Sequence, residues 1–307
     1  MTGTVVKSTG SWYLVRGHAE GQLYKCRLRG KFKNKGLKVS NPIAVGDEVT
    51  LEPEGGEHQA VITVIKPRRN YIIRKSTHKA HHAHIVASNL DQAFLVVTLV
   101  SPRTSFGFID RFLVTAEAYS IPATLLFNKL DLYDQDTQGY LDQVMQLYQQ
   151  IGYPCFPCSA HTGEGISEIQ GLLAEKVTLF TGHSGVGKST LVNSLVPDLD
   201  IKTSEISAFS DKGVHTTTFA EMFEVGNNTY LIDTPGIKEL GVVEMKKEEI
   251  GHYFPEMRAR LNKCRFDNCI HVNEPGCAIQ DAVKKGKIAL PRYESYLSLL
   301  QNDDSHR

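Results

Sequence analysis

A chain of 307 residues exceeds the size of one small module and predicts two or three domains. Its 41% hydrophobic and 22% charged residues exclude wholesale disorder, and its longest apolar run, at 94–100, is far too short to span a bilayer. The six cysteines are too few for a disulfide scaffold, and the first residues lack the apolar core of a signal peptide. We therefore expect a reduced, cytoplasmic protein that needs no membrane.

The formal net charge of zero conceals an asymmetry along the chain. Residues 1–82 carry 15 Lys and Arg against 6 Asp and Glu, a net charge of +9. Residues 83–240 carry 8 against 18, a net charge of −10, and residues 241–307 carry 11 against 10. A basic first third suggests an acidic partner, most simply a nucleic acid, although the two oppositely charged parts could also attract one another.

The first third of the sequence has the pattern of short strands separated by glycine-containing turns. Strands are expected at 4–6, 12–15, 23–28, 48–51 and 60–65, which suits an OB-fold barrel. The segment 29–41 carries five basic residues and Phe32, and it could contact phosphates and a base or be an ordinary solvated loop. A group of histidines follows and is interpreted as a polar linker rather than a metal site: His78, His81, His82 and His84.

From about residue 85 the hydrophobic period changes. Apolar strands are expected at 94–100, 123–127, 177–181 and 229–232, and helices at 110–119, 140–151, 166–174 and 188–196. Buried strands that alternate with amphipathic helices indicate a parallel sheet covered on both faces. After Gly241 the pattern is helical, with a cysteine cluster in the middle and Pro291 at the start of a last helix.

A complete phosphate-binding loop follows the strand at 177–181 and opens the helix at 188–196. Its glycines let successive backbone N–H groups curl around the β-phosphate, and the helix N-terminus adds partial positive charge. Lys188 would neutralise β- and γ-phosphate oxygens, and the Ser189 hydroxyl would ligate Mg²⁺. The residues assigned to this part of the site are Gly182, His183, Ser184, Gly185, Val186, Gly187, Lys188, Ser189 and the adjoining Thr190.

A second motif indicates which base is bound. It ends the strand at 123–127 and consists of Asn128, Lys129, Leu130 and Asp131. The Asp131 carboxylate can accept from guanine N1–H and from the 2-amino group, whereas adenine would leave the buried charge unpaired. Asn128 can hydrogen-bond the base edge, and Lys129 can lie along the ring. Ser159 and Ala160 follow another short strand and place the Ala160 N–H to read guanine O6, so the ensemble predicts GTP rather than ATP.

Two further motifs complete a site for the nucleotide and Mg²⁺. Asp233 follows the strand at 229–232 and would hold Mg²⁺ through water, and the N–H of Gly236 would meet the γ-phosphate. The three threonines at 216–218 should supply a switch residue that ligates Mg²⁺. Thr217 is favoured for this role, and Thr216 is the alternative.

The residues around the γ-phosphate predict slow hydrolysis. Ile237 stands where many GTPases carry a glutamine that orients water, and an isoleucine cannot do so. The missing polar group would come from His215 or from an RNA partner, and His215 could equally be an ordinary surface residue of the switch. Lys188, Thr217 and His215 are the candidate catalytic residues.

The order of these motifs is unusual. Common GTPases run from the phosphate-binding loop through the switch threonine and DxxG to NKxD and then SA. Here NKLD and SA come first, and the loop, the threonines and DTPG follow. Such a circular permutation is tolerated because the same strands can be joined differently while the site stays intact.

The basic barrel, the permuted GTPase motifs with GHSGVGKS and HTTT, and a C-terminal C-x4-C-x-H-x5-C cluster resemble the bacterial RsgA family, also called YjeQ or YloQ. The resemblance covers essentially the whole chain. It implies a GTPase that binds the small (30S) ribosomal subunit and its rRNA, acts late in maturation of that subunit, and is stimulated by it. It also implies a switch rather than a metabolic enzyme, and we expect a monomer.

The C-terminal cluster predicts one structural zinc ion. Three thiolates and an imidazole within 14 residues suit a closed tetrahedral Zn²⁺ site: Cys264, Cys269, His271 and Cys277. The small segment around them would gain folding energy from the metal, and buried free cysteines are the alternative. Cys155 and Cys158 form an isolated C-x2-C and are interpreted as strand residues without a redox or metal role.

The expected fold is therefore α/β with three parts: an OB-fold RNA-binding barrel at 1–72, a circularly permuted P-loop GTPase domain at 85–240 and a helical zinc-binding domain at 241–307, with a linker at 73–84. Only residues 237–241 join the last nucleotide motif to the zinc-binding domain, so movement at the γ-phosphate should reach that domain. Two other functions remain in competition. One is a GTP-gated RNA-binding protein whose hydrolysis is incidental, and the other is an accessory GTPase of tRNA modification.

Overall fold

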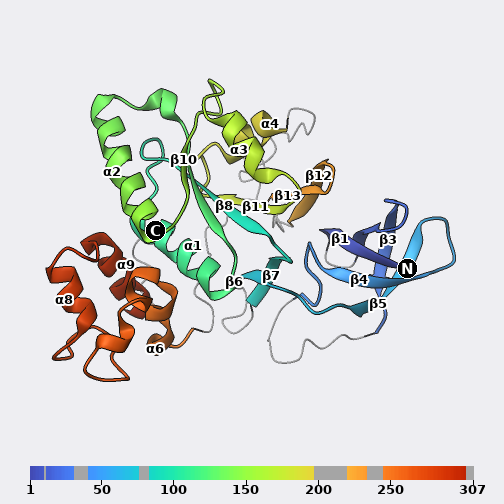
Figure 1. Ribbon diagram of the computed structural model, residues 1–307. Coiled ribbons are helices and arrows are strands. Elements are labelled where there is room, and N and C mark those ends of the chain that lie inside the picture. The colour runs from blue at the N-terminus through green and yellow to red at the C-terminus, as the bar shows by residue number, and fades with distance from the viewer. Residues whose placement is uncertain (10–11, 31–40, 76–82, 197–219, 234–244, 302–307) are drawn as a thin grey trace, which may run out of the picture.

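The computed structural model describes residues 1–9, 12–30, 41–75, 83–196, 220–233 and 245–301. These residues form a β-barrel, a central α/β domain and a helical C-terminal domain, and the last two pack closely against each other (Figure 1). None of the helices in these ranges combines the length and the apolar character that a membrane span requires.

The described part of the N-terminal third closes into a barrel. Its strands are β1 (Thr2–Ser8), β2 (Tyr13–Gly17), β3 (Leu23–Leu28), β4 (Glu48–Pro53) and β5 (Gln59–Ile65). They follow the order β1-β2-β3-β5-β4, and β4 pairs back onto β1. Val5, Val15, Val49 and Ile62 alternate with outward residues and fill the interior. The five-stranded barrel that the sequence predicted is confirmed for these residues.

A short antiparallel hairpin leads from the barrel into the central domain. It is formed by β6 (Tyr71–Lys75) and β7 (Ala83–Ser88). Both strands overlap the linker expected at 73–84. Ile72, Ile73 and Ile85 are buried, which explains why 71–75 and 83–88 form strands rather than a polar connection.

The central sheet is largely parallel. Parallel strands β8 (Gln92–Val97), β9 (Ala123–Phe127), β10 (Cys155–Pro157), β11 (Val177–Gly182) and β13 (Thr229–Asp233) are joined at one edge by antiparallel β12 (Glu221–Gly226). Their order is β10-β9-β8-β11-β13-β12, and β12 pairs in turn with β1 of the barrel. Every residue of β8 and β9 is buried, as expected of strands that are covered on both faces.

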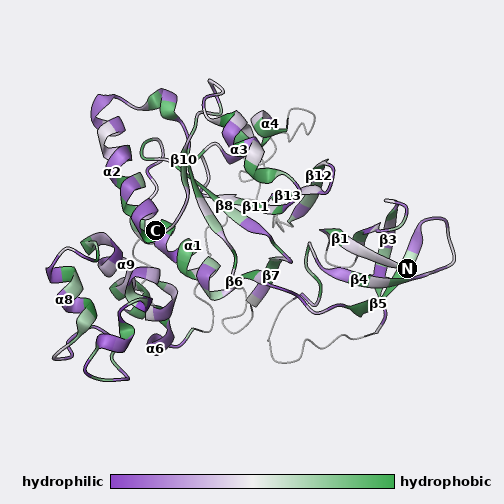
Figure 2. Cartoon of the chain, viewed as in Figure 1, coloured by the Kyte–Doolittle hydropathy of each residue, from purple (hydrophilic) through white to green (hydrophobic). Residues whose placement is uncertain are grey.

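Helices cover both faces of this sheet. They are α1 (Phe106–Ala118), α2 (Gln135–Ile151), α3 (Ile166–Leu173) and α4 (Lys188–Leu195). Apolar residues of α1 and α2 pack in one core cluster and those of α3 and α4 in another, on opposite sides of the strands (Figure 1). Hydrophobic and hydrophilic residues alternate along α2 in Figure 2, as expected of a helix with one buried face.

One predicted strand is too long. The strand expected at 94–100 ends at Val97, because the next residues form a turn that leaves the sheet. The Thr98 hydroxyl donates to the carbonyl of Pro102, and the backbone N–H of Thr98 donates to the Thr104 hydroxyl at 3.1 Å. These local bonds replace the strand ladder with a turn that lies beside the loop at 182–189.

The C-terminal domain contains helices and no strand among its described residues, as the sequence predicted. Its elements are α6 (Lys247–Ile250), η4 (Gly251–Tyr253), α7 (Pro255–Arg258), η5 (Leu261–Lys263), α8 (Ala278–Lys284) and α9 (Leu290–Gln301). Phe254, Met257 and Tyr296 form its core together with Val114 of α1, so this core is shared with the central domain.

A buried aspartate joins the barrel to the hairpin. The carboxylate of Asp47, which has no exposed surface, accepts two hydrogen bonds from the Arg68 guanidinium, both at 2.6 Å. Its Oδ1 also accepts from the Ser88 hydroxyl at 2.6 Å, and its Oδ2 accepts from the Ala44 N–H at 2.9 Å. A buried carboxylate with all these partners fixes the barrel against β7.

We predict that Asp47→Ala lowers the free energy of unfolding by about 3 kcal/mol, because it removes the carboxylate partner of the largely buried Arg68 guanidinium. The exposed Arg27–Glu54 pair offers the control, and Glu54→Ala should cost less than about 1 kcal/mol. Urea unfolding followed by fluorescence of Trp12, the single tryptophan of the chain, measures both variants. Equal midpoints for the two variants would contradict the prediction.

Candidate nucleotide site and metal cluster

The predicted nucleotide motifs that the structure describes gather at one edge of the central sheet. The parallel strands β9, β10, β11 and β13 all end there, and each is followed by one of the motifs. Open α/β sheets bind ligands at this edge, outside the carboxyl ends of their strands.

The loop at 182–189 has a backbone conformation that favours glycine at two positions. Gly185 and Gly187 have φ angles of +85° and +84°, in the left-handed region. A Cβ on Gly187 would lie 2.6 Å from Nδ2 of Asn128, and one on Gly182 would lie 2.6 Å from the carbonyl oxygen of Val96. The glycines therefore allow the loop to curve tightly and to contact the neighbouring strand end.

A lysine and a carboxylate meet where this loop enters α4. Lys188 is buried, and its Nζ donates to Oδ1 of Asp233 at the end of β13. Ser189 is half-buried and Thr190 exposed in the first turn of the same helix. The arrangement places an ammonium, a hydroxyl and a carboxylate together at a helix N-terminus, which are groups that hold a phosphate and its divalent cation.

Asn128 joins three loops of the site. Its side chain is only 1% exposed, its Nδ2 donates to the carbonyl of Val186 at 2.9 Å, and its Oδ1 accepts from the N–H of Ala160 at 3.0 Å. The amide therefore ties the loop at 182–189 to the loop after β10. In this structure Asn128 and the Ala160 N–H thus bond to each other, rather than being directed toward open space.

Lys129 crosses the loop at 182–189. It has a left-handed backbone, with φ of +69°, and its Nζ donates to the carbonyls of Gly185 and Ser101 at 2.7 and 2.6 Å. The stem of the side chain therefore lies above the loop, where a ligand on the loop would contact it. Leu130 follows, begins the short helix η1 (Leu130–Leu132) and packs against the main core.

The carboxylate of Asp131 is exposed and held in one orientation. Its Oδ1 accepts from the hydroxyl of buried Ser159 at 2.5 Å. The same hydroxyl oxygen accepts from the N–H of Thr162 at 3.1 Å, which fixes the hydroxyl. An exposed carboxylate whose direction is set by a buried partner can accept further hydrogen bonds from a ligand.

Sequence reasoning missed a tyrosine that organises this edge. The Tyr133 hydroxyl donates to the backbone carbonyl of Asn128 at 3.1 Å and accepts from the N–H of Leu99 at 2.9 Å. It therefore bridges the ends of β8 and β9, and burial raises the pKa of Tyr133. No spacing or motif in the sequence marked this residue, since its role depends on two strand ends that meet only in the fold.

The isolated C-x2-C has no reactive environment. Cys155 lies in β10, and Cys158 follows that strand and approaches Oδ1 of Asn128 at 3.8 Å. Burial raises the pKa of each thiol to about 12, so both stay protonated near neutral pH and are poor nucleophiles. The strand position expected of both holds for Cys155, whereas Cys158 lies one residue after β10 and is buried.

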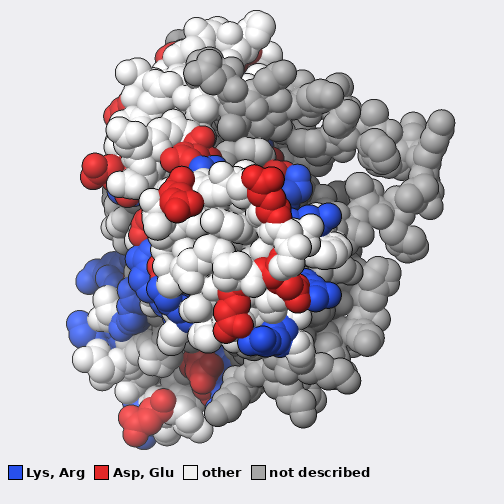
Figure 3. All heavy atoms as spheres, turned by 90° about the vertical axis from the view of Figure 1, so that its right-hand side faces the viewer, with Lys and Arg blue, Asp and Glu red and all other residues white. Residues whose placement is uncertain are grey.

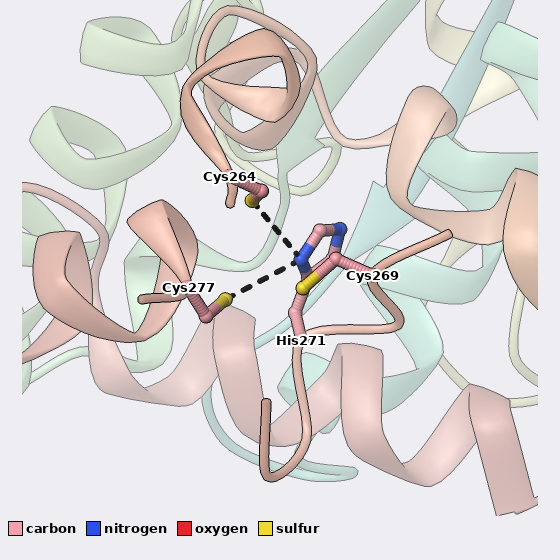
Figure 4. A group of neighbouring side chains, drawn as sticks. All are labelled: Cys264, Cys269, His271 and Cys277. Atoms are coloured by element: carbon pink, nitrogen blue, oxygen red, sulfur yellow. Dashed lines mark hydrogen bonds between the residues drawn. The ribbon is translucent and has the colours of Figure 1, made fainter. Parts of the chain in front are cut away.

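The C-terminal cysteines and histidine converge on one point. In Figure 4 the side chains of Cys264, Cys269, His271 and Cys277 point toward one another, and their possible ligand atoms all lie within 4.8 Å of one another. Nδ1 of His271 lies 3.7 Å from Sγ of Cys264 and 3.5 Å from Sγ of Cys277. Tetrahedral zinc with ordinary Zn–S and Zn–N bonds separates its ligands by about 3.6 Å, so the donor set and its spacing fit one Zn²⁺.

Neighbouring groups hold the loop that carries His271. The carboxylate of Glu274 accepts from the N–H groups of Ile270 and Val272, both at 2.8 Å. On α9, the hydroxyls of Tyr293 and Tyr296 donate to the carbonyls of His271 and Ile270 at 2.6 and 2.7 Å. These bonds maintain the backbone of His271 at a φ of +60°, in the left-handed region.

Comparison with known proteins agrees with this geometry. A sequence model of the RsgA GTPase family matches residues 65–243, and one of the RsgA N-terminal domain matches residues 2–62. The chain is 54% identical over 306 residues to the small ribosomal subunit biogenesis GTPase RsgA of Bacteroides fragilis, covering 99% of this chain and 97% of that one. The chain belongs to the RsgA GTPase family.

Solved structures of similar proteins share the whole fold. YjeQ from Thermotoga maritima is 34% identical with a TM-score of 0.77, over 100% of this chain and 99% of that one. YloQ, described as a circularly permuted GTPase, is 27% identical with a TM-score of 0.72, over 100% of this chain and 96% of that one. The predicted fold class is therefore confirmed, and the chain is a GTP hydrolase.

Some residues of the predicted RsgA-type site lie outside the described residues. They belong to the switch threonines, the DTPG motif after its aspartate, and the candidate water-orienting position: His215, Thr216, Thr217, Thr218, Gly236 and Ile237. The same holds for most of the basic segment at 29–41 and for His78, His81 and His82.

The described face of the RsgA-type barrel is not uniformly basic. Figure 3 shows lysine and arginine interspersed with aspartate and glutamate on the side of the molecule that carries the barrel. Within 1–69, each lysine and arginine whose side chain is described forms an ion pair, except Lys25, which lies over the Trp12 ring at 4.7 Å. Lys7–Glu221 and Arg16–Glu224, both at 2.8 Å, join the barrel to β12. The basic first third and the acidic middle of the chain therefore do attract one another at this contact.

Proposed function

We propose that this GTPase acts in biogenesis of the small ribosomal subunit. It binds the 30S subunit and its rRNA, hydrolyses GTP late in maturation of the subunit, and is stimulated by the subunit. The observation that carries the proposal is the permuted GTP site attached to a small barrel in a chain that matches, over 99% of its length, a relative named for this process. We further propose that it acts in the cytoplasm as a monomer.

The geometry supports a role for each described residue of the nucleotide site. The backbone of 182–187 would surround the β-phosphate, and Lys188 would move from Asp233 to the β- and γ-phosphate oxygens. Ser189 would then ligate Mg²⁺, and Asp233 would hold it through water. Asp131, oriented by Ser159, would accept from guanine, while Asn128 and Ala160 would shape the base pocket and Lys129 would lie along the ring.

Hydrolysis depends on residues at 215–237 in this proposal. Thr217 would complete the Mg²⁺ coordination, and the N–H of Gly236 would contact the γ-phosphate. Because Ile237 cannot orient water, His215 or a group of the rRNA would supply that function. Binding to the subunit would then raise the hydrolysis rate, as in other GTPases that receive a catalytic group from a partner.

We also propose one structural Zn²⁺ held by Cys264, Cys269, His271 and Cys277, in a four-ligand site without an open position. Bound zinc would draw the loop around His271 onto η5 and α8 and so stabilise the C-terminal domain. The proposed domains are 1–72, 85–240 and 241–307, with the segment 73–84 as the connection between the first two.

We predict that Asp131→Asn weakens GTP binding and removes the bias against xanthine nucleotides, because an amide N–H can face the xanthine oxygen. The measurement is the dissociation constant for GTP, XTP and ATP by equilibrium titration. Asp136→Asn, an exposed change in the first turn of α2, is the control and should keep the parental order. An unchanged preference among the three nucleotides in Asp131→Asn would show that the base pocket is assigned wrongly.

Freshly purified protein should contain one zinc per chain by elemental analysis. Cys269→Ser should lower the zinc content and make residues 245–301 more susceptible to proteolysis, because the metal no longer joins the loop to the helices. Cys26→Ser changes a buried cysteine of the barrel and should leave the zinc content at one. Finding no zinc in the parental protein would overturn the assignment.

Small ribosomal subunits should accelerate GTP hydrolysis strongly, and a GTP analogue should tighten subunit binding relative to GDP. Turnover with and without subunits, and co-sedimentation in the two nucleotide states at several salt concentrations, measure these effects. Binding without acceleration would favour a GTP-gated RNA-binding protein. Absence of both binding and acceleration, with tRNA as the better ligand, would favour tRNA modification.

A further inference from the structure

Helix α1 packs on two different parts of the protein with two different faces. Phe108, Phe112 and Ala116, spaced by one helical turn, lie in the core cluster with the central strands. Asp110, Val114 and Glu117 lie on another face, and each contacts the C-terminal domain. Because α1 is rigid and contacts both the central strands and the C-terminal domain, a displacement of one of these parts is transmitted to the other.

The first face reaches the phosphate-binding loop directly. The ring of Phe108 stacks on the imidazole of His183, with centroids 3.6 Å apart and planes at 29°. His183 is the second residue of the loop, between the end of β11 and Gly185. Because the stack covers one side of a residue in the loop, it restricts where the loop backbone can lie.

The face of α1 that contacts the C-terminal domain carries one partner of a fully buried ion pair. Nη1 of Arg292 on α9 donates to Oδ1 of Asp110 at 2.6 Å, and neither side chain is exposed. Nε and Nη2 of Arg292 donate to the Glu256 carboxylate at 2.7 and 3.2 Å, and the Tyr148 hydroxyl donates to Oδ1 of Asp110 at 2.8 Å. A buried network of this kind allows one arrangement of α9 against α1, since any displacement leaves charges unpaired.

We infer that Phe108 is a positioning residue for the phosphate-binding loop, and that α1 couples this loop to the C-terminal domain through the Asp110–Arg292 pair. Nucleotide binding and the native docking of α9 then favour each other, and the coupling is reciprocal. The inference goes beyond a role in ribosome biogenesis. It rests only on the assignment of 182–189 to the phosphates, which loss of GDP binding in Lys188→Ala tests separately.

A double-mutant cycle on the full chain tests the coupling, with GDP affinity as the readout. Arg292→Met should weaken GDP binding by about fivefold or more, although Arg292 lies in the C-terminal domain. In a Phe108→Leu background, which removes the stack, the same change should alter GDP affinity by less than about twofold. Arg258→Met is the matched control, because it breaks the exposed Arg258–Glu117 pair between the same helix and the same domain and should leave GDP affinity unchanged.

If Arg292→Met does not fold, amide hydrogen exchange in the parental protein and in Phe108→Leu still tests the coupling. In the parental protein, GDP should slow amide exchange in 290–301 as well as in the loop, and Phe108→Leu should abolish only the effect in 290–301. Unchanged GDP affinity in folded Arg292→Met would overturn the inference. So would independent effects of the two substitutions, or GDP protection that is confined to the loop.

Discussion

Parallel strands present their carboxyl ends at one edge of a sheet, and the proposed nucleotide site of this protein depends on that constraint. The loops after β9, β10 and β11 meet there with Asp233 at the end of β13, whatever the order in which the chain visits the strands. The amide of Asn128 then ties two of these loops together within hydrogen-bond distance. A circular permutation therefore leaves the site intact, because it changes only the connections at distant points of the fold.

The permutation changes what is attached to the site. The central domain is bound on one side to the barrel through β12 and the hairpin, and on the other to the C-terminal domain through α1. The attachment through β12 differs in chemistry from those through the hairpin and α1, which contain the buried Asp47 and Asp110 carboxylates. Barrel contacts include half-exposed ion pairs such as Lys7–Glu221, which salt can screen, whereas Asp110–Arg292 is fully buried and resistant to screening.

The sequence predicted the parts that rest on local pattern. The glycine loop, the barrel strands, the helices of the central domain and the cysteine cluster have spacings that local backbone and metal chemistry dictate. It could not predict contacts that exist only in the folded state, such as the Tyr133 bridge or the stack of Phe108 on His183. The strand expected at 94–100 ends at Val97, because local hydrogen bonds of the Thr98 and Thr104 side chains with nearby backbone groups replace the pairing between strands.

The net charge of residues 1–82 could be counted from the sequence, but the ion pairs that these residues form could not. Three of the nine excess positive charges of residues 1–82 pair with carboxylates outside that segment, in Lys7–Glu221, Arg16–Glu224 and Arg69–Asp91. Four further lysines of this part of the chain stand at 31–38, outside the described residues.

The pairing of β1 with β12 covers part of an edge of the central sheet. Strand β12 is antiparallel at the border of the central sheet, and its outer backbone groups would form an open edge if nothing covered them. The barrel strand contacts this edge at Lys7 and Glu221, beside the ion pair of the same residues. A central domain separated from its barrel would expose this part of the edge, to which another strand could add, so the barrel also covers part of a sheet edge.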